Sequence, residues 1–236
     1  VFGTSALASL PTLLSEAFEA PGGAVEVDTS ELAQGFSTDL PSHRAQHFHA
    51  WVPIMTGCNK FCTYCIVPYV RGRERSRTFE SVVSECRLLA ADGVREITLL
   101  GQNVNSYGRD VYGSPRFAEL VRAVGETGVD RIRFTSSNPK DLSDEVIAAM
   151  AETPSVMPHL HLAVQSGSTR VLKAMNRRYT REQYLELVSR LRSAMPDLAL
   201  STDVIVGFPG EEEEDFLQTL SLVREAAFSS AFTFIY

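Results

Sequence analysis

Gly57-Cys58-Asn59-Lys60-Phe61-Cys62-Thr63-Tyr64-Cys65 is the most informative stretch of this chain. It holds three of the four cysteines in a C-x3-C-x2-C pattern, just behind the apolar segment Trp51-Val52-Pro53-Ile54-Met55. Three thiolates at this spacing can bind three irons of a cubane cluster. With no fourth cysteine or histidine nearby, the pattern predicts a 4Fe-4S cluster on Cys58, Cys62 and Cys65 that leaves one iron open to a substrate.

Other uses of three cysteines fit this sequence less well. A structural zinc site usually has four ligands, but the next cysteine is the isolated Cys86 and the next histidine is His159. Disulfide frameworks belong to short, cysteine-dense chains, and an electron-transfer cluster of the ferredoxin type needs a fourth thiolate close to the other three. We expect Cys86 to be a small buried hydrophobic residue rather than a ligand.

The composition is that of a globular chain with a sizeable core, since 44% of the 236 residues are hydrophobic and 22% are charged. No apolar run is long enough to cross a membrane. The chain begins at Val1 without a signal-peptide pattern, so we expect a fragment or processed piece of a cytoplasmic protein. Reduced thiols are consistent with that compartment.

The charge pattern leaves several readings open. The net charge of −7 is not the basic footprint of a typical nucleic-acid-binding protein. A local row of four arginines follows the cysteine loop (residues 57–65). It could be a solvated face, a set of helix-flanking ion pairs or a contact for phosphates. These arginines are Arg71, Arg73, Arg75 and Arg77. The acidic run 211–215 is expected to cap the helix after it.

The chain divides into two parts by its sequence pattern. Residues 1–20 have helical spacing, and residues 24–48 form an irregular, polar stretch. We therefore assign residues 1–49 to the end of a preceding domain plus a linker, and residues 50–236 to one domain.

Residues 50–236 alternate between strand-like and helical patterns. The predicted strands are residues 51–55, 96–100, 131–135, 159–164, 198–207 and 230–236. The predicted helices are residues 79–92, 117–126, 143–152, 168–175, 181–195 and 213–226. Such alternation indicates parallel βαβ units with right-handed crossovers. The expected fold is α/β, a partial TIM-like barrel of six strands preceded by a remnant helix and linker.

Polar residues follow each of the first five predicted strands. The cysteine loop follows the first, and the others lead into residues 101–105, 136–139, 165–168 and 201–211. The carboxyl ends of parallel strands carry the chemistry in barrels and open α/β sheets, so these loops are expected to form one site. In the fourth strand, His159 and His161 flank Leu160, and we expect one of the two histidines to face the core.

Residues 57–72 resemble the methylthiotransferases of the radical S-adenosylmethionine (radical SAM) enzymes. The resemblance rests on the C-x3-C-x2-C pattern, with Tyr64 before the last cysteine, at the end of a first barrel strand. It runs from about Trp51 to Tyr236, and residues 1–20 are similar to the last helix of that family's N-terminal domain. The resemblance implies a radical SAM barrel, one 4Fe-4S cluster in this chain and S-adenosylmethionine bound at its open iron.

The resemblance also implies a reaction. Some members methylthiolate carbon 2 of a modified adenosine next to the tRNA anticodon, and others methylthiolate an aspartate of a ribosomal protein. Leu99-Leu100-Gly101-Gln102-Asn103-Val104-Asn105-Ser106-Tyr107 looks like the tRNA enzymes. The implied partners are then the anticodon stem-loop of tRNA and an external electron donor, with a monomeric state expected. A binding module with a purely structural cluster is the alternative of another class.

By the same resemblance, the polar loops that follow the strands, here called the rim, should contact S-adenosylmethionine. Tyr64 is expected at the adenine through its backbone, and Gln102 and Asn103 near the methionyl end. The remaining candidates are Ser136, Gln165 and Asp203 for the ribose and amino groups, and Arg177 for the carboxylate. In the family a second cluster sits on three cysteines of the N-terminal domain, and this chain has no such second set. We therefore expect it to cleave S-adenosylmethionine without completing methylthiolation.

Overall fold

A computed structural model describes residues 9–19, 44 and 46–236 of the chain. The chain divides into two compact units, residues 1–45 and 46–236. In the first unit the structure describes α1 (Leu10–Glu19), which lies within the helix predicted for residues 1–20. The irregular stretch predicted for residues 24–48 falls largely outside the described residues. The assignment of residues 1–49 to the end of another domain stays a prediction.

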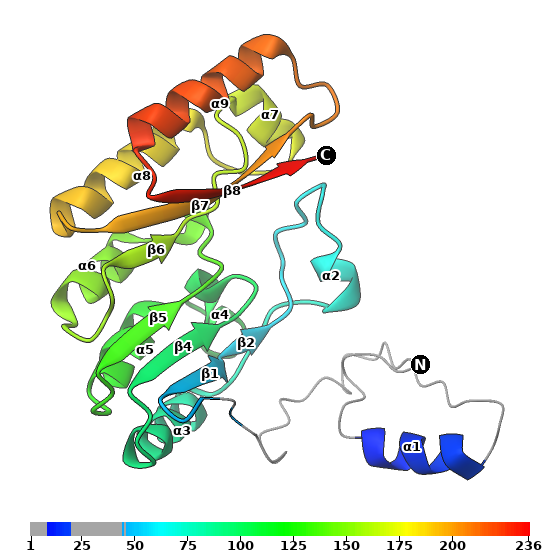
Figure 1. The fold of residues 1–236 in the computed structure, drawn as a ribbon, viewed down its shortest axis with the longest axis vertical. Coiled ribbons are helices and arrows are strands. Elements are labelled where there is room, and N and C mark those ends of the chain that lie inside the picture. The colour runs from blue at the N-terminus through cyan, green and yellow to red at the C-terminus, as the bar shows by residue number, and fades with distance from the viewer. Residues whose placement is uncertain (1–8, 20–43, 45) are drawn as a thin grey trace. The chain divides into compact units, whose positions relative to one another are not determined.

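The second unit is built on six parallel strands (Figure 1), as predicted. They are β1 (His49–Pro53), β4 (Glu96–Leu100), β5 (Arg131–Phe134), β6 (His159–His161), β7 (Ala199–Val206) and β8 (Ser230–Ile235). They pair in the orders β1-β4-β5 and β6-β7-β8. Single parallel bridges, Ile132 with Val156 and Ser137 with Leu162, join β5 to the second set. This parallel α/β arrangement is the expected partial barrel.

Six helices connect these strands, and each lies within two residues of its predicted range. They are α3 (Phe79–Ala91), α5 (Phe117–Gly125), α6 (Asp144–Glu152), α7 (Thr169–Ala174), α8 (Arg181–Ala194) and α9 (Glu213–Ala226). Local capping sets several of their starts. The side chains of Thr78 and Ser143 accept hydrogen bonds from the third residue on, and Thr180 forms a capping box with Gln183.

Several short elements were not predicted, and they cluster in the loops at the carboxyl ends of the strands. They are β2 (Met55–Thr56), β3 (Arg75–Ser76), α2 (Val67–Val70), α4 (Arg109–Tyr112) and the 3-10 helices η2 (Val104–Ser106) and η3 (Pro139–Asp141). Elements of two to four residues are too short to show a hydrophobic period. Their positions depend on loop contacts described below.

The core lies between the sheet and its helices. Buried residues alternate with more exposed ones along β1 and β5, whereas β4 and β7 have runs of buried residues. Ile97, Ile132 and Leu160 on strands β4 to β6 are fully buried together with Leu120 of α5 and Leu191 of α8. One hydrophobic cluster spans both sets of strands, so burial of apolar surface stabilises them as one body.

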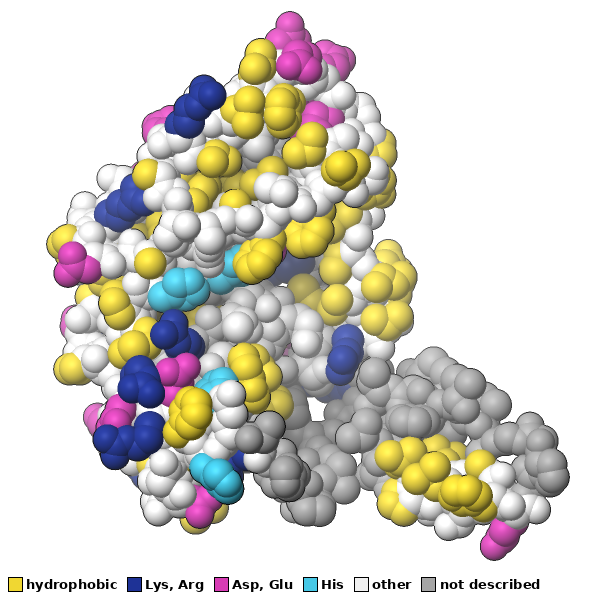
Figure 2. Space-filling model, in the orientation of Figure 1, with side chains coloured by type: hydrophobic (Ala, Val, Ile, Leu, Met, Phe, Trp, Pro, Cys, Tyr) yellow, Lys and Arg dark blue, Asp and Glu magenta, His cyan; other side chains and the backbone are white. Residues whose placement is uncertain are grey.

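The opposite face of the sheet is open and largely polar (Figure 2), with histidine, arginine and hydrophobic side chains side by side. Glu96 pairs there with Arg131 and Arg133 from the neighbouring strand. His159 and His161 both lie on this face, whereas Leu160 between them is buried. The prediction that one histidine faces the core was wrong, because residues two apart on a strand share a face.

None of the described helices is long and apolar enough to cross a membrane.

Candidate functional site

The cysteine loop runs from the end of β2 to the short α2 and returns through β3. Its entry is a tight crossing at Gly57, whose φ is +77° and whose position leaves no room for a side chain. A Cβ there would lie 1.9 Å from the carbonyl oxygen of Arg73. The backbone N–H of Cys58 donates to the carbonyl of Gly72 at 3.1 Å. Glycine is therefore required for the two arms of the loop to meet.

A network of buried side chains holds the first half of the loop. Glu74, which is buried, accepts from the backbone N–H and the amide of Asn59 at 3.3 and 3.5 Å. The Asn103 amide nitrogen donates to Glu74 at 3.4 Å and to Asp141 at 2.8 Å. Asp141 in turn forms an ion pair with Lys60. Both residues between Cys58 and Phe61 are thus tied to the body of the barrel.

The segment after α7 clamps the second half of the loop. The backbone N–H and the hydroxyl of Thr63 donate to the carbonyls of Met175 and Ala174, both at 3.1 Å. The Asn176 amide donates to the carbonyls of Lys60 and Phe61 at 3.2 and 2.9 Å. Asn176 and Phe61 both have positive φ, 57° and 49°. Non-glycine residues in this region cost about 1–3 kcal/mol and cluster at functional sites.

The three cysteines of the loop are free thiols, Cys58 buried and Cys62 and Cys65 half-buried. Burial raises the pKa of the Cys58 thiol to about 11, so metal binding would have to displace its proton. No three His, Cys, Asp or Glu side chains in the described part of the chain could hold a single metal ion. A cubane cluster is different because each thiolate binds a separate iron. The donor set fits such a cluster.

Gln102 and Asn103 follow β4 and carry buried oxygen atoms that lack a partner. The side-chain oxygens Oε1 of Gln102 and Oδ1 of Asn103 accept no hydrogen bond in the described structure. The amide nitrogen of Asn103 is committed to Glu74, Asp141 and Ser106. A buried acceptor without a donor is costly. Two neighbouring ones suit a ligand with N–H groups, such as the ammonium of a methionyl group.

Ser136 and Gln165 lie in the loops after β5 and β6 and have a left-handed backbone conformation, with φ of 61° and 70°. Gln165 is buried and its backbone bonds to β7 on both sides, to Asp203 at 2.8 Å and from Ile205 at 2.9 Å. Ser136 is exposed. Together with Phe61 and Asn176, they are four of the five positive-φ residues other than glycine in the described chain. Backbone strain is concentrated at the predicted rim.

Asp203 lies on β7 next to His161 of β6. His161 Nε2 is 3.1 Å from Asp203 Oδ2, and its Nδ1 is 3.0 Å from the hydroxyl of Ser201. No local pattern in the sequence pairs these residues, since register between distant strands is set by folding. Tyr64 packs its ring against a small cluster that includes Val171 and Ile205, which leaves its backbone as the part that could contact a ligand.

Arg177 is buried and makes three hydrogen bonds within the protein. Its Nε donates to the Tyr179 hydroxyl at 3.0 Å, its Nη2 to the Ala163 carbonyl at 2.8 Å and its Nη1 to Cys62 Sγ at 3.7 Å. It lies beside the cysteines, as a rim residue should. The predicted contact with a carboxylate stays a prediction, with three of the five guanidinium N–H groups already engaged.

Three further expectations concern Cys86, the row of arginines and the acidic run 211–215. Cys86 is fully buried, as predicted. Arg77 is buried rather than solvated and makes a helix-flanking ion pair, as one of the alternatives predicted: it bonds to Glu85 of α3 at 2.5 Å, to Ser81 at 2.8 Å and to the Pro53 carbonyl at 3.0 Å. The acidic run behaves as predicted at Glu212, which caps α9 in a capping box with Asp215. Glu211 instead accepts from the backbone N–H of Gly207, at 2.5 Å.

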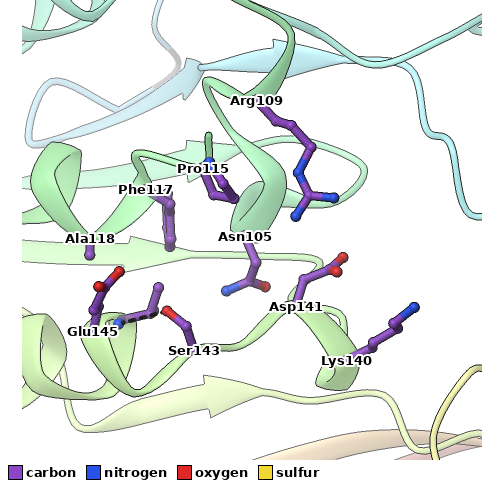
Figure 3. Close-up of a pocket in the computed structure, with 10 residues that line it drawn as sticks. Asn105, Arg109, Pro115, Phe117, Ala118, Lys140, Asp141, Ser143 and Glu145 are labelled. Atoms are coloured by element: carbon purple, nitrogen blue, oxygen red, sulfur yellow. Dashed lines mark hydrogen bonds between the residues drawn. The ribbon is translucent and has the colours of Figure 1, made fainter. Parts of the chain in front are cut away.

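A pocket of about 330 Å³ lies behind this network, among α4, α5, η3 and α6. Figure 3 shows Arg109 and Asn105 pointing toward Asp141, with Phe117 on the opposite wall. Neither the cysteines nor any residue predicted to contact S-adenosylmethionine lines it, although Asn105 comes from the predicted loop 101–105. Its connection to the site is Asp141, which also pairs with Lys60. We do not assign this pocket to a cofactor.

The structure is an open parallel barrel with three free thiols on one loop at its rim, which is a donor set that suits an iron–sulfur cluster. Residues 52–223 match the family described as the radical SAM superfamily. Because this match covers more than half of the chain, the chain belongs to the radical SAM superfamily. That family implies a 4Fe-4S cluster and S-adenosylmethionine as cofactors.

Curated relatives narrow the comparison. The chain is 54% identical over 239 residues to the tRNA-2-methylthio-N(6)-dimethylallyladenosine synthase of Carboxydothermus hydrogenoformans, covering 100% of this chain and 53% of that protein. It is 54% identical over 237 residues to the enzyme of the same name from Acidothermus cellulolyticus, covering 100% of this chain and 47% of that protein. The chain thus spans about half the length of the curated relatives it matches.

Solved structures agree on the fold. The radical SAM methyltransferase TsrM of Kitasatospora setae superposes with a TM-score of 0.65 and 17% identity, covering 79% of this chain and 36% of that one. Coproporphyrinogen III oxidase of Escherichia coli superposes with a TM-score of 0.55 and 17% identity, covering 80% of this chain and 44% of that one. At such identities the likeness supports the barrel and not the substrate.

Proposed function

We propose that this chain is the radical-generating core of a methylthiotransferase that converts N6-dimethylallyladenosine next to the tRNA anticodon to its 2-methylthio derivative. The cysteine loop carries this proposal, because three free thiols on a rigidly anchored loop match the ligand set of a site-open cubane cluster. The identity of 51–54% to proteins named as that synthase supports the tRNA substrate.

We further propose that Cys58, Cys62 and Cys65 bind the cluster and that S-adenosylmethionine lies between it and the rim. When bound, the two cofactors supply reductive cleavage of the sulfonium and hydrogen abstraction from the substrate. The unpartnered oxygens of Gln102 and Asn103 would accept from the methionyl ammonium. The remaining contacts are proposed for Ser136, Gln165 and Asp203 at the polar groups, for the Tyr64 backbone at the adenine and for Arg177 at the carboxylate.

The number of clusters is a separate part of the proposal. Three of the four cysteines belong to the loop and the fourth, Cys86, is a residue of α3 that is fully buried in the core. These 236 residues therefore supply thiolates for one cluster. Other parts of the whole protein would bind the second cluster that methylthiolation requires, and they would make much of the contact with tRNA. We propose a cytoplasmic monomer that receives electrons from an external donor.

The direct test is anaerobic reconstitution of the chain with iron and sulfide, followed by reduction in the presence of S-adenosylmethionine. We expect about four irons per chain and formation of 5′-deoxyadenosine. A loaded cluster that yields no 5′-deoxyadenosine would favour a binding module with a structural cluster. About eight irons, or methylthiolated tRNA from this chain alone, would contradict the single-cluster proposal.

The substrate is tested with the whole enzyme. Given tRNA that carries N6-dimethylallyladenosine, and separately a ribosomal protein, the enzyme should methylthiolate only the RNA. Mass spectrometry of nucleosides and of peptides distinguishes the two products. Modification of an aspartate in the ribosomal protein would replace the tRNA proposal with the alternative member of the family.

A further inference from the structure

The burial of Arg177 raises the question of what balances its charge. Its side chain is about nine-tenths buried, and a guanidinium keeps its proton in proteins. None of the ion pairs in the described part of the chain includes Arg177. An unpaired buried charge is strongly destabilising. A counter-charge is therefore expected from a group that binds next to it.

The neighbours of the guanidinium identify the side on which that charge must lie. Tyr179 is a neutral phenol, because its hydroxyl donates to the Val164 carbonyl at 2.9 Å while it accepts from Arg177. The second contact is the neutral carbonyl of Ala163. The third is Cys62 Sγ, at 3.7 Å from Nη1. Cys62 is the neighbour that becomes negative when it binds iron.

The position of Arg177 is fixed by the clamp between the two loops. The preceding residue, Asn176, bonds to both carbonyls that lead into Cys62. The backbone N–H of Arg177 donates to Leu172 at 2.8 Å, at the end of α7. The segment that carries Arg177 is hydrogen-bonded to the cysteine loop on both sides of Cys62. The packing of these two segments therefore fixes the contact between Arg177 and the Cys62 sulfur.

We propose that Arg177 is a positioning residue for the cluster: its guanidinium donates an N–H to the sulfur of Cys62 and stabilises the reduced state of the cluster. This inference rests on the proposed function, since it needs a cluster on the three cysteines. A 4Fe-4S core of charge 2+ with three thiolates carries a net charge of −1. Uptake of one electron from the external donor makes the core 1+ and the net charge −2. Hydrogen bonds to sulfur and nearby charge set the potential of such clusters.

The experiment is a redox titration of the reconstituted full chain, monitored by electron paramagnetic resonance, for Arg177→Gln and Arg177→Lys. With Arg177→Gln we expect about a tenfold lower ratio of reduced to oxidised cluster at a fixed potential, which is about 59 mV for one electron. Arg177→Lys keeps the charge but loses the planar fork. Its cluster potential should therefore lie between those of the unsubstituted chain and Arg177→Gln. Arg178→Gln is the matched control, because it removes the same charge from an exposed neighbour that has no ion pair in the described structure.

Three outcomes would overturn the inference. The first is a loaded Arg177→Gln chain with an unchanged potential, and the second is an equal shift in Arg178→Gln. The third outcome applies if Arg177→Gln takes up no iron. It is a loaded Arg177→Lys chain whose potential and resonance spectrum match those of the unsubstituted chain. If the unsubstituted chain itself binds no cluster, it is the proposed function that fails.

Discussion

Cys58, Cys62 and Cys65 depend on neighbours that carry no redox chemistry of their own. Glu74 and Asn176 hold the loop from two sides through hydrogen bonds to its backbone. In parallel, Gly57 allows the two arms of the loop to cross. At the scale of single residues, the site is therefore prepared by polar contacts before any metal binds.

Replacement of Cys65 by alanine removes a ligand from the half-buried part of the loop. We expect the Cys65→Ala chain to lose most of its iron and sulfide after reconstitution, because three thiolates are needed for a site-open cubane. Cys86→Ala removes the same group from the core and should keep the full iron content, with a stability loss of about 1 kcal/mol. Iron and sulfide analysis distinguishes the two, and full loading of Cys65→Ala would contradict the ligand assignment.

Gly57→Ala tests the crossing of the two arms. At Gly128, where φ is +89° and nothing lies within 4 Å of a new Cβ, alanine should cost about 1–2 kcal/mol from backbone strain alone. At Gly57 the strain is joined by the clash with the Arg73 carbonyl, so we expect a larger loss of stability together with a lower iron content. Urea denaturation of both variants measures the difference. Equal losses would mean that the loop can move away without cost.

At the scale of elements, Asp215 joins α7 to α9. It accepts from the Ser168 hydroxyl at 2.5 Å and from the Glu212 backbone at 2.9 Å, and it pairs with Arg170. The hydrogen bond from Arg170, followed by that from Ser168, lowers the pKa of Asp215 to about 2. The start of α7 is thus held by a carboxylate that belongs to a different crossover.

This lowered pKa predicts a pH dependence. A carboxylate whose pKa is lower in the folded state stabilises the protein above its unfolded pKa of about 3.9, and the contribution is lost as the pH falls to about 2. Asp215→Asn should therefore be about 1–2 kcal/mol less stable than the unsubstituted chain at pH 7. The difference should shrink between about pH 4 and pH 2. Urea denaturation across this range checks it, and a constant difference would contradict the role of the charge.

At the scale of the whole molecule, the two sets of three strands share one hydrophobic core. Only single bridges link β5 to the second set, so few strand-to-strand hydrogen bonds hold the two sets together. The shared apolar cluster is what makes residues 46–236 one cooperative body, with the cysteine loop on the first set and Gln165 and Asp203 on the second.

Leu160→Ala tests this shared core. Leu160 is fully buried on β6, and its truncation should cost about 2–5 kcal/mol. Trp51, the one tryptophan of the sequence, lies on β1 in the other set. Its fluorescence and the circular dichroism of the helices should change in a single transition that moves to lower urea. Leu88→Ala, at a position 71% exposed, should change stability by less than about 0.5 kcal/mol. Separate transitions would show that the two sets unfold independently.

The sequence by itself determined the six strands and the six helices, and it singled out the three cysteines that we propose as cluster ligands. Hydrophobic periodicity and cap residues such as Thr78 and Ser143 act over a few residues, so they are visible in any window of the chain. The C-x3-C-x2-C spacing is equally local. One of the two histidines of β6 was placed on the wrong face, although the period of a strand was sufficient to place both on the same face.

Only the tertiary structure decided how the loops meet. The pairing of Glu74 with Asn59, of Asp203 with His161 and of Arg177 with Cys62 joins residues 15, 42 and 115 positions apart. Contacts at such separations follow from strand register and loop packing, which no local pattern encodes. The sequence therefore specified which residues could bind the cluster, and folding decided which residues surround it, because charge and hydrogen bonding act through space and not along the chain.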